Sequence, residues 1–317
     1  MKYLHTILFF IGFFLCITNS YSQSKPTILG KGIISRGAME FNATLTKNND
    51  VLFFTIGNPM WSSLAICYSE KEAGEWNKPK LLPFSGKYLD ADPFLFNENQ
   101  LFFISDRPTE SNLEYKKWDY NIWYSTLINN EWSKPIYLEG SFNDLGMLLY
   151  PSLSKNKNLY FTAKGENKNA LYVSKWNEKE SEYSAPKKLS FINDDINYLD
   201  AVVSKDESFI IFTANMEGGF GGNDLWISFK EEDIWGQPIN LGAKINSSGN
   251  DGQPGLSPDG KVLYYSYGGS LNSQPLVYDT YKDLYRSLTS AQNGFLDIYH
   301  IEINIERYKA LKNNTKS

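Results

Sequence analysis

Polar side chains recur at two matched positions along the chain, and their types and spacing could do chemistry. The first position is polar in four repeats, at Glu40, Asp90, Tyr198 and Asp251. The second position lies two residues further on and is polar in five, at Asn42, Asp92, Tyr150, Asp200 and Gln253. Two carboxyl groups roughly 5–9.5 Å apart, one protonated and one ionised, are the catalytic pair of glycoside hydrolases. The acids among these residues are therefore candidate catalytic groups. The other interpretation is that they cap backbone amides between neighbouring strands.

A repeated unit must position these residues. The pattern Pro-x-x-Leu recurs at intervals of 53, 56, 51 and 52 residues, at Pro26–Leu29, Pro79–Leu82, Pro135–Leu138, Pro186–Leu189 and Pro238–Leu241. Self-similarity at such a period indicates a repeat architecture in which each unit is one supersecondary element. A repeat scaffold hosts many activities, so the function has to be argued from the site.

Each unit carries four short strand signals separated by polar turns. The first strands begin at the matched polar residues and cover Glu40–Leu45, Asp92–Phe96, Leu149–Leu153, Asp200–Ser204 and Gln253–Ser257. The second strands are nearly all apolar, as in Val51–Thr55, which is typical of strands buried on both faces. The fourth strands begin with an aromatic residue and contain the proline, so we expect them at the outer edge of each sheet.

Four-stranded sheets repeated around an axis form a β-propeller. The first Pro-x-x-Leu unit precedes the first strand of the first repeat, and no fourth strand follows the third strand of the fifth repeat. We therefore predict an all-β propeller of five four-stranded blades, whose ring closes when the N-terminal strand pairs near Asp297–Ile301. A sixth blade would have to hide in Gly268–Gly294, which lacks the strand pattern. Because residues two apart on a strand share a face, both polar sets should ring the mouth of the central channel.

The repeats resemble a known family. Ser257–Ser266 (SPDGKVLYYS) and Leu296–Tyr299 (LDIY) are similar to the WD40-like repeat called PD40, found in TolB-like propellers. Met216–Trp226, Trp235–Gly242 and Ile245–Asn246 match the version of that repeat found in envelope proteins. The resemblance covers residues 25–303 and implies the propeller fold. Repeats of this family occur in periplasmic binding scaffolds, in proteins fused to peptidoglycan-binding domains and in hydrolase accessory domains. This chain shows no fused domain, and it has five predicted blades where TolB has six.

Two long insertions lie between second and third strands. Strand connectivity places them, together with the fourth-to-first connections, on one face of the ring, here called the long-loop face. The second repeat carries Arg107–Trp118, and the fifth carries Gly268–Gly294 with Tyr278, Tyr281 and Tyr285 at the spacing of a short amphipathic helix. Long loops in compact domains are often functional, so Arg107, Trp118, Tyr278 and Tyr281 are candidate ligand-binding residues. Alternatively, these aromatic residues pack the loops onto the propeller rim.

Metal and histidine chemistry receive little support. The chain has two histidines, His5 in the leader and His300 in a predicted strand, which does not favour a Ser-His-Asp triad or a histidine-rich metal centre. Asp194, Asp195 and Asp200 could form an all-carboxylate calcium site, or they are simply solvated loop residues. No cofactor is expected. We interpret Cys67 as a core residue because aromatic residues occupy its position in the other repeats.

The N-terminus predicts export. Residues 1–22 combine Lys2, an apolar stretch and Ser20-x-Ser22, which together are typical of a cleaved secretory signal. Lipoprotein processing at Cys16 is not favoured because bulky Leu15 precedes it. No second apolar stretch is long enough to span a membrane. We expect a periplasmic or secreted propeller over residues 23–303, and a short basic, solvated tail over residues 304–317.

Charge narrows the choice of partners. The formal net charge is −5 and the pI is about 5.3, so the chain lacks the basic footprint of a nucleic-acid-binding protein. The main hypothesis is a monomeric, non-enzymatic envelope propeller that binds a protein or glycan on the long-loop face. The alternative is a glycosidase that uses Glu40, Asp90, Asp92, Asp200 or Asp251.

Overall fold

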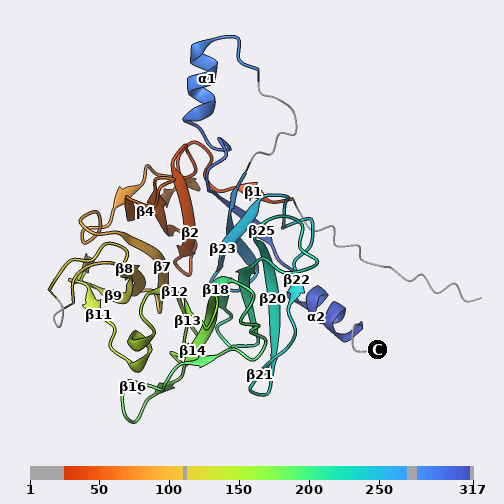
Figure 1. Cartoon of the computed structure of the whole chain (residues 1–317). Helices are drawn as coiled ribbons and strands as arrows, with labels where there is room; N and C mark the ends of the chain where they lie inside the picture. Colours follow the sequence, from red (N-terminus) through yellow and green to blue (C-terminus); the bar gives the residue numbers. More distant parts are fainter. Residues whose placement is uncertain (1–24, 110–112, 270–276, 315–317) are drawn as a thin grey trace, which may run out of the picture.

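The computed structural model describes residues 25–109, 113–269 and 277–314, which form a β-propeller of five blades around a central axis (Figure 1). The predicted fold class is thereby confirmed, whereas the expected signal segment and Cys16 lie outside the described residues. Each blade contributes one inner strand, and each inner strand contacts the next one around the ring. The inner strands are β2 (Met39–Leu45), β7 (Asp90–Phe96), β12 (Leu148–Leu153), β18 (Tyr198–Val203) and β23 (Asn250–Leu256).

Two further strands follow the inner strand in every blade. The second strands are β3 (Val51–Gly57), β8 (Gln100–Ser105), β13 (Leu159–Lys164), β19 (Phe209–Ala214) and β24 (Val262–Gly268). The third strands are β4 (Leu64–Glu72), β9 (Asn121–Ile128), β14 (Asn169–Ser174), β20 (Asp224–Glu231) and β25 (Asp297–Glu302). All neighbouring strands pair antiparallel, as tight polar turns between them require.

The outer edge of the first four blades is broken into short pieces. In the first blade β5 (Glu75–Trp76) and β6 (Lys80–Leu81) both pair with β4, and Pro79 lies between them. Proline has no N–H to donate to the ladder, so the strand is interrupted there. The corresponding pieces are β10 (Glu131–Trp132), β11 (Ile136–Tyr137), β16 (Glu182–Tyr183), β17 (Lys187–Lys188), β21 (Ile234–Trp235) and β22 (Ile239–Asn240). In the third blade β16 pairs with β15 (Trp176–Asn177), which follows the third strand.

The ring closes between the two ends of the chain. Strand β1 (Thr27–Ile28) pairs antiparallel with β25, with Thr27 opposite His300, and the fifth sheet has the order β1-β25-β24-β23. Just beyond β1, the Leu29 N–H donates to the Ile298 carbonyl at 2.8 Å. The predicted closure by the N-terminal strand is therefore confirmed.

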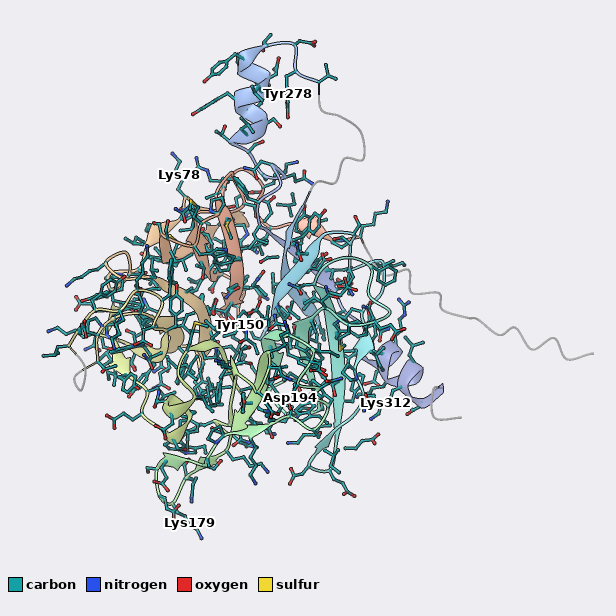
Figure 2. All side chains as sticks on the ribbon, in the orientation of Figure 1. Lys78, Tyr150, Lys179, Asp194, Tyr278 and Lys312 are labelled. Carbon is teal, nitrogen blue, oxygen red and sulfur yellow. The ribbon has the colours of Figure 1, made fainter. Side chains whose placement is uncertain are left out.

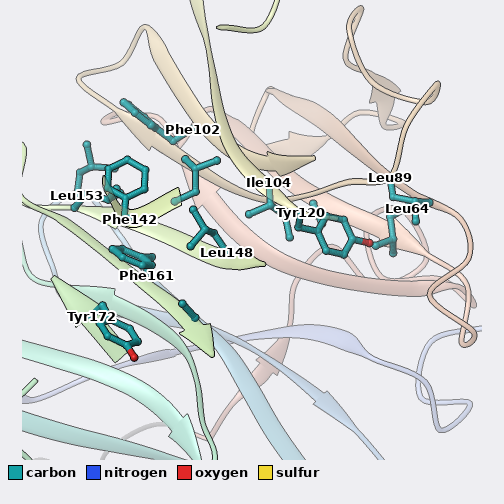
Figure 3. Close-up of a cluster of buried hydrophobic side chains, with 14 of the residues drawn as sticks. Leu64, Leu89, Phe102, Ile104, Tyr120, Phe142, Leu148, Leu153, Phe161 and Tyr172 are labelled. Carbon is teal, nitrogen blue, oxygen red and sulfur yellow. The ribbon is translucent and has the colours of Figure 1, made fainter. Parts of the chain in front are cut away.

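The hydrophobic core lies between neighbouring blades. Figure 3 shows one such cluster, in which Phe102 of the second blade meets Phe142 and Phe161 of the third. Phe142 comes from a 3-10 helix, η1 (Ser141–Leu145), which inserts this ring beneath the third blade's sheet. Phe142 and Phe161 are fully buried, as expected for apolar strands covered on both faces. Cys67 is also buried in a core cluster, in agreement with its interpretation as a core residue.

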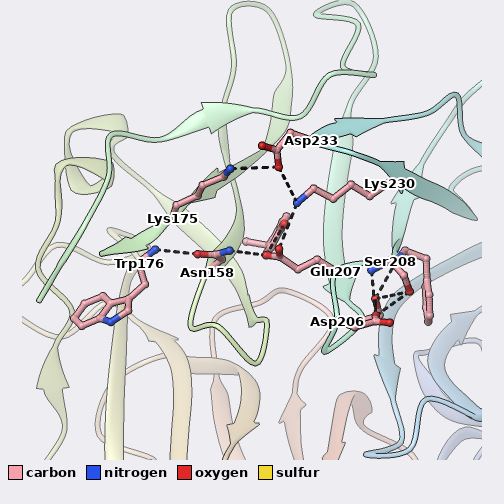
Figure 4. Close-up of polar contacts among 11 residues, drawn as sticks. Asn158, Lys175, Trp176, Asp206, Glu207, Ser208, Lys230 and Asp233 are labelled. Atoms are coloured by element: carbon pink, nitrogen blue, oxygen red, sulfur yellow. Dashed lines mark hydrogen bonds and ion pairs between the residues drawn. The ribbon is translucent and has the colours of Figure 1, made fainter. Parts of the chain in front are cut away.

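Polar contacts join blades where the sheets reach the surface. Glu207 of the fourth blade accepts from Asn158 Nδ2 of the third at 2.8 Å and forms an ion pair with Lys230 at 3.3 Å (Figure 4). Asp233 lies near both Lys230 and Lys175. These contacts join the third blade to the fourth.

The C-terminal tail differs from the solvated segment that the sequence predicted. Residues 305–314 are not a solvated end; they form the helix α2 (Ile305–Asn314), which packs beside the fourth blade (Figure 1). Tyr308 is 2% exposed, and its hydroxyl donates to the Leu241 carbonyl at 2.9 Å. Lys312 forms an ion pair with Glu231. The tyrosine supplies an apolar anchor that a count of basic residues does not reveal.

The insertion in the fifth blade forms the predicted short helix, α1 (Tyr281–Leu288), capped by the Thr280 hydroxyl. No residue of α1 is buried, and Tyr281 is 78% exposed. Figure 1 shows the helix standing away from the blades, so its aromatic residues do not pack onto the rim. Within the described residues, no helix is long and apolar enough to cross a membrane.

Candidate functional site

A β-bulge interrupts each inner strand at the second matched polar position. The register against the neighbouring strand shifts at this point in every blade. The residue at the bulge has a left-handed backbone in each case, with φ of 57° at Asn42, 55° at Asp92, 53° at Tyr150, 43° at Asp200 and 49° at Gln253. Bulges bend a strand and redirect side chains. Residues two apart across the bulge therefore no longer share a face, contrary to the expectation from strand alternation.

The first polar position is buried away from the channel. Asp90 is fully buried, forms an ion pair with Arg107 at 2.6 Å and accepts a hydrogen bond from the Ser85 hydroxyl at 2.9 Å. Asp251, 1% exposed, accepts from the Ser247 N–H and hydroxyl. These carboxylates hold loops to the ends of the strands.

Glu40 has a similar role with fewer partners. It is fully buried, and its Oε2 accepts from the Arg36 N–H at 3.3 Å. Burial raises the pKa of this carboxyl to about 7. Of the five candidate catalytic acids, Glu40, Asp90 and Asp251 are thus enclosed by the protein.

Asp92 lies on the channel at the centre of a hydrogen-bonded chain. It accepts from the side-chain amide of Asn42 in the preceding blade and from the Tyr150 N–H in the next blade, the latter at 3.0 Å. Tyr150 reaches across the ring, and its hydroxyl donates to the Pro254 carbonyl at 2.7 Å. Figure 2 shows Tyr150 near the middle of the propeller. The channel is therefore narrowed by this residue rather than open throughout.

Asp200 repeats the arrangement on the other side of the channel. Its Oδ2 accepts from Gln253 Nε2 of the next blade at 3.1 Å. Burial raises the pKa of Asp200 to about 7. Burial and then the negative charge of Asp200 raise the pKa of Asp92 to about 8. The charges of the two carboxyls therefore interact.

A cavity of about 800 Å³ opens on the long-loop face above these two acids. Asp92, Asp200, Asn250 and Gln253 are its polar lining from the inner strands, and Asn223 lines it from a loop. Most of its walls are apolar or aromatic. The aromatic lining residues are Phe41, Trp61, Trp118, Tyr120 and Phe295. A partly enclosed apolar cleft with a few convergent polar groups has the character of a ligand site.

Two tryptophans from different blades form the rim of this cavity. Trp118 Nε1 donates to the Trp61 carbonyl at 3.2 Å, and Trp61 packs edge-on against Phe41 with ring centroids 5.3 Å apart. Asp106 supports the rim because it accepts from the Trp118 N–H and from the Tyr115 hydroxyl. Trp118, a candidate from the sequence, therefore lies at the cavity, together with Trp61, which the sequence analysis missed.

A second cavity, of about 720 Å³, occupies the opposite mouth of the channel. Asp92 lines both cavities and Tyr150 lines this one, so the bulge residues lie between the two mouths. Ile305, Glu306 and Lys309 of α2 form part of its wall. The remaining lining comes largely from the inner strands and the short polar turns that follow them.

The other sequence candidates lie outside the cavity above Asp92 and Asp200. The Arg107 guanidinium is occupied by Asp90 and Ser105, and the ring of Tyr88 packs against it. Tyr278 bonds to Ser287 beside α1, away from the propeller (Figure 2). Tyr281 is on the same helix.

The structure does not bring the candidate calcium ligands together. Asp194 forms an ion pair with Lys188, and Asp195 accepts from Asn167, whereas Asp200 faces the channel. Within residues 25–109, 113–269 and 277–314, no group of three or more His, Cys, Asp or Glu side chains is arranged to hold a metal ion.

Fold and site together define a five-bladed β-propeller with a polar-floored, aromatic-walled cavity. Neither a family model nor a curated protein sequence matches the chain. Among solved structures it is similar to TolB from Acinetobacter baumannii, with 11% identity, 84% of this chain and 55% of that one covered, and a TM-score of 0.48. The chain thus spans about half the length of that TolB structure.

Other similar structures have different descriptions. A protein of unknown function from Dyadobacter fermentans is 12% identical over 89% of this chain and 99% of its own, with a TM-score of 0.49. An α-L-arabinofuranosidase from Lactobacillus brevis is 11% identical over 86% and 93%, with a TM-score of 0.47. At these identities the likeness concerns the fold alone.

Proposed function

We propose that this protein is a non-enzymatic binding propeller of the PD40, TolB-like type, exported to the cell envelope. It binds a protein or glycan partner through the cavity on the long-loop face. The observation that carries the proposal is the cavity itself: aromatic side chains wall it, and Asp92, Asp200 and Gln253 form its floor. Rigid aromatic surfaces around a few fixed polar groups are typical of recognition sites.

The state of the acids favours binding over hydrolysis. A glycosidase needs one carboxyl that is ionised in the resting enzyme and another that is protonated. Here the pKa values of Asp92 and Asp200 are both raised, to about 8 and about 7, so neither is held as a firmly ionised nucleophile at neutral pH. Both are also held by hydrogen bonds from the next blade.

Glycoside hydrolysis is the second candidate function, and one observation supports it. Asp92 and Asp200 are the two candidate acids that share the cavity, and their raised pKa values would suit a general acid. Steady turnover of aryl glycosides that falls by about a hundredfold or more in both Asp92→Asn and Asp200→Asn would establish it. Equal rates in the wild type and both variants would exclude these residues as catalysts.

Site-directed crosslinking tests the binding function. A photoreactive phenylalanine analogue replaces Trp118 at the cavity rim, and a matched control places it at Ile234, which is 63% exposed on an outer strand. In cells that make the full chain, we expect a discrete adduct from position 118 and none from position 234. The adduct should disappear when Asp92→Asn and Asp200→Asn are added. Adducts from both positions alike, or from neither, would contradict a partner on the long-loop face.

A further inference from the structure

The cavity on the long-loop face has two carboxyls on its floor and no positive side chain among its described lining residues. Asp92 and Asp200 both line the cavity, and no Lys, Arg or His is among its described lining residues. Elsewhere in the propeller, some acids with little exposure have a cationic partner, as Asp90 has Arg107 and Glu207 has Lys230. Others, such as Asp251, are held by hydrogen-bond donors instead. The cavity floor thus holds two carboxyls that share one cavity with no cation among its described lining residues.

Amide oxygens without partners accompany the two acids. Gln253 lines the cavity, and its Oε1 is buried without a hydrogen-bond partner within the described residues. Asn42 does not line the cavity, but it is 2% exposed and its Oδ1 also lacks a partner there. The amide nitrogens of both side chains already donate to Asp92 and Asp200. Beside the two acids, the buried polar atoms that still lack a partner are therefore acceptors, and a complementary ligand brings donors.

The walls set the shape of that ligand. Above the acids, Phe41, Leu149 and Phe295 line the cavity, and Trp61 and Trp118 line its rim. An apolar chain fits between such walls, and aromatic faces attract a cation that passes them. A sugar presents donors and acceptors alike, whereas an ammonium group presents three donors and no acceptor.

We propose that the cavity binds a primary alkylammonium group, with the charged nitrogen between Asp92 and Asp200 and the alkyl chain against the aromatic walls. The inference rests on the proposed binding function and names its ligand class. The same group is available from two sources, a lysine side chain of a protein partner or a free alkyl diamine. The ligand supplies a positive partner for the two acids and a donor for Gln253 Oε1, the unpartnered amide oxygen whose residue lines the cavity.

Calorimetric titration of the full mature chain tests the proposal with n-pentylamine and its neutral isostere 1-pentanol. We expect pentylamine to bind about tenfold or more tightly than pentanol. Binding should strengthen from pH 6 to pH 9, because the carboxyls ionise over this range while an alkylamine stays charged, with a pKa near 10.4. Asp200→Asn and Asp92→Asn should each lower the affinity for pentylamine by about tenfold or more, with little effect on the affinity for pentanol. The matched control Asp194→Asn changes an acid that pairs with Lys188 in a loop, and it should bind like the wild type.

Two further probes distinguish the sources. Tighter binding of Nα-acetyl-lysine-methylamide than of 1,5-diaminopentane points to a lysine on a protein, and the reverse order points to a free diamine. Equal affinity for pentylamine and pentanol, or full pentylamine affinity in folded Asp200→Asn, overturns the ammonium proposal. If that happens while the crosslink at position 118 persists, the binding function stands and only its ligand class is wrong. Thermal unfolding of each variant verifies that it is folded.

Discussion

Asp92 accepts a hydrogen bond from the backbone N–H of Tyr150, so a carboxylate of the second blade holds the bulge residue of the third. Asp200 and Gln253 repeat the contact between the fourth and fifth blades. The same two acids form the floor of the cavity on the long-loop face. Blade-to-blade cohesion and the candidate binding site therefore depend on the same side chains, and substitutions there must be examined for both effects.

Stability should fall as pH rises because of Asp92. Its pKa is about 8 in the folded protein against an ordinary value of 3.8, so the folded state holds a proton that the unfolded state has released. The contribution is fully present below pH 3.8 and is lost as pH rises through about 8. Urea unfolding at pH 5 and pH 9 should show the wild type losing more stability than Asp92→Asn.

The comparison between variants isolates this effect. Other buried groups also titrate in the window, including Glu40, with a pKa near 7, and His300, whose pKa burial lowers. Their contributions are common to wild type and variant and cancel in the difference. A parallel pH dependence of the two proteins would show that Asp92 is not protonated in the folded state.

A second prediction follows from the left-handed backbone conformation at Asn42. A β-branched side chain is strained at φ 57°, whereas glycine is not. Asn42→Val should unfold about 1–2 kcal/mol more easily than Asn42→Gly, since both variants lose the same amide. Denaturant titration of the pair measures the difference. Equal stability of the two variants would contradict a bulge at this position.

This bulge also marks the limit of the sequence analysis. The Pro-x-x-Leu period and the run of apolar second strands predicted the five blades, and the early position of Pro26 predicted the ring closure. Strand alternation, however, placed Asp90 and Asp92 on one face. Asp92 is an ordinary residue in the sequence, and nothing local shows that its φ is positive. One bulge per blade sends Asp90 into the protein and leaves Asp92 on the channel.

Ring closure should depend on Leu29. Its side chain is 6% exposed in the core cluster beside β1, and its N–H bonds to Ile298 of the last blade. Leu29→Ala should cost about 2–5 kcal/mol of unfolding free energy, as buried leucine truncations do. The matched control Leu288→Ala, at a residue 56% exposed on α1, should cost far less. Chemical denaturation of both variants measures the difference, and equal losses would argue against closure through β1.

Removal of one oxygen atom tests whether Tyr308 anchors α2. Tyr308→Phe removes the hydroxyl that bonds to the Leu241 carbonyl and should cost about 0.5–1.5 kcal/mol. Tyr285→Phe, on the exposed face of α1, should stay within about 0.5 kcal/mol of the wild type. Hydrogen exchange of the α2 amides should accelerate in the first variant only. Unchanged exchange there would mean that the helix does not depend on this contact.

Parts of the candidate site could be found from the sequence and parts could not. Trp118 was found because it ends a long insertion. Trp61 and Phe295 were missed because they lie in connections without a repeated motif, and only the ring brings them together. Arg107 illustrates the opposite difficulty: the insertion suggested an accessible charge, but Asp90 holds it within the protein. Whether such a charged side chain is accessible depends on its partner in the folded protein, and the spacing of residues along the chain does not show that partner.

The most direct test of the account is an NMR titration of the aspartate side-chain carboxyls in the full mature chain, assigned with Asp92→Asn and Asp200→Asn. The account predicts that these two carboxyls titrate near pH 8 and pH 7, far above the ordinary value of 3.8, because both lie partly buried on the floor of one cavity without a cation among its lining residues. Saturation with pentylamine should lower both midpoints. Midpoints near 4 without ligand, unmoved by the amine, would contradict the shared acidic floor on which the proposed site depends.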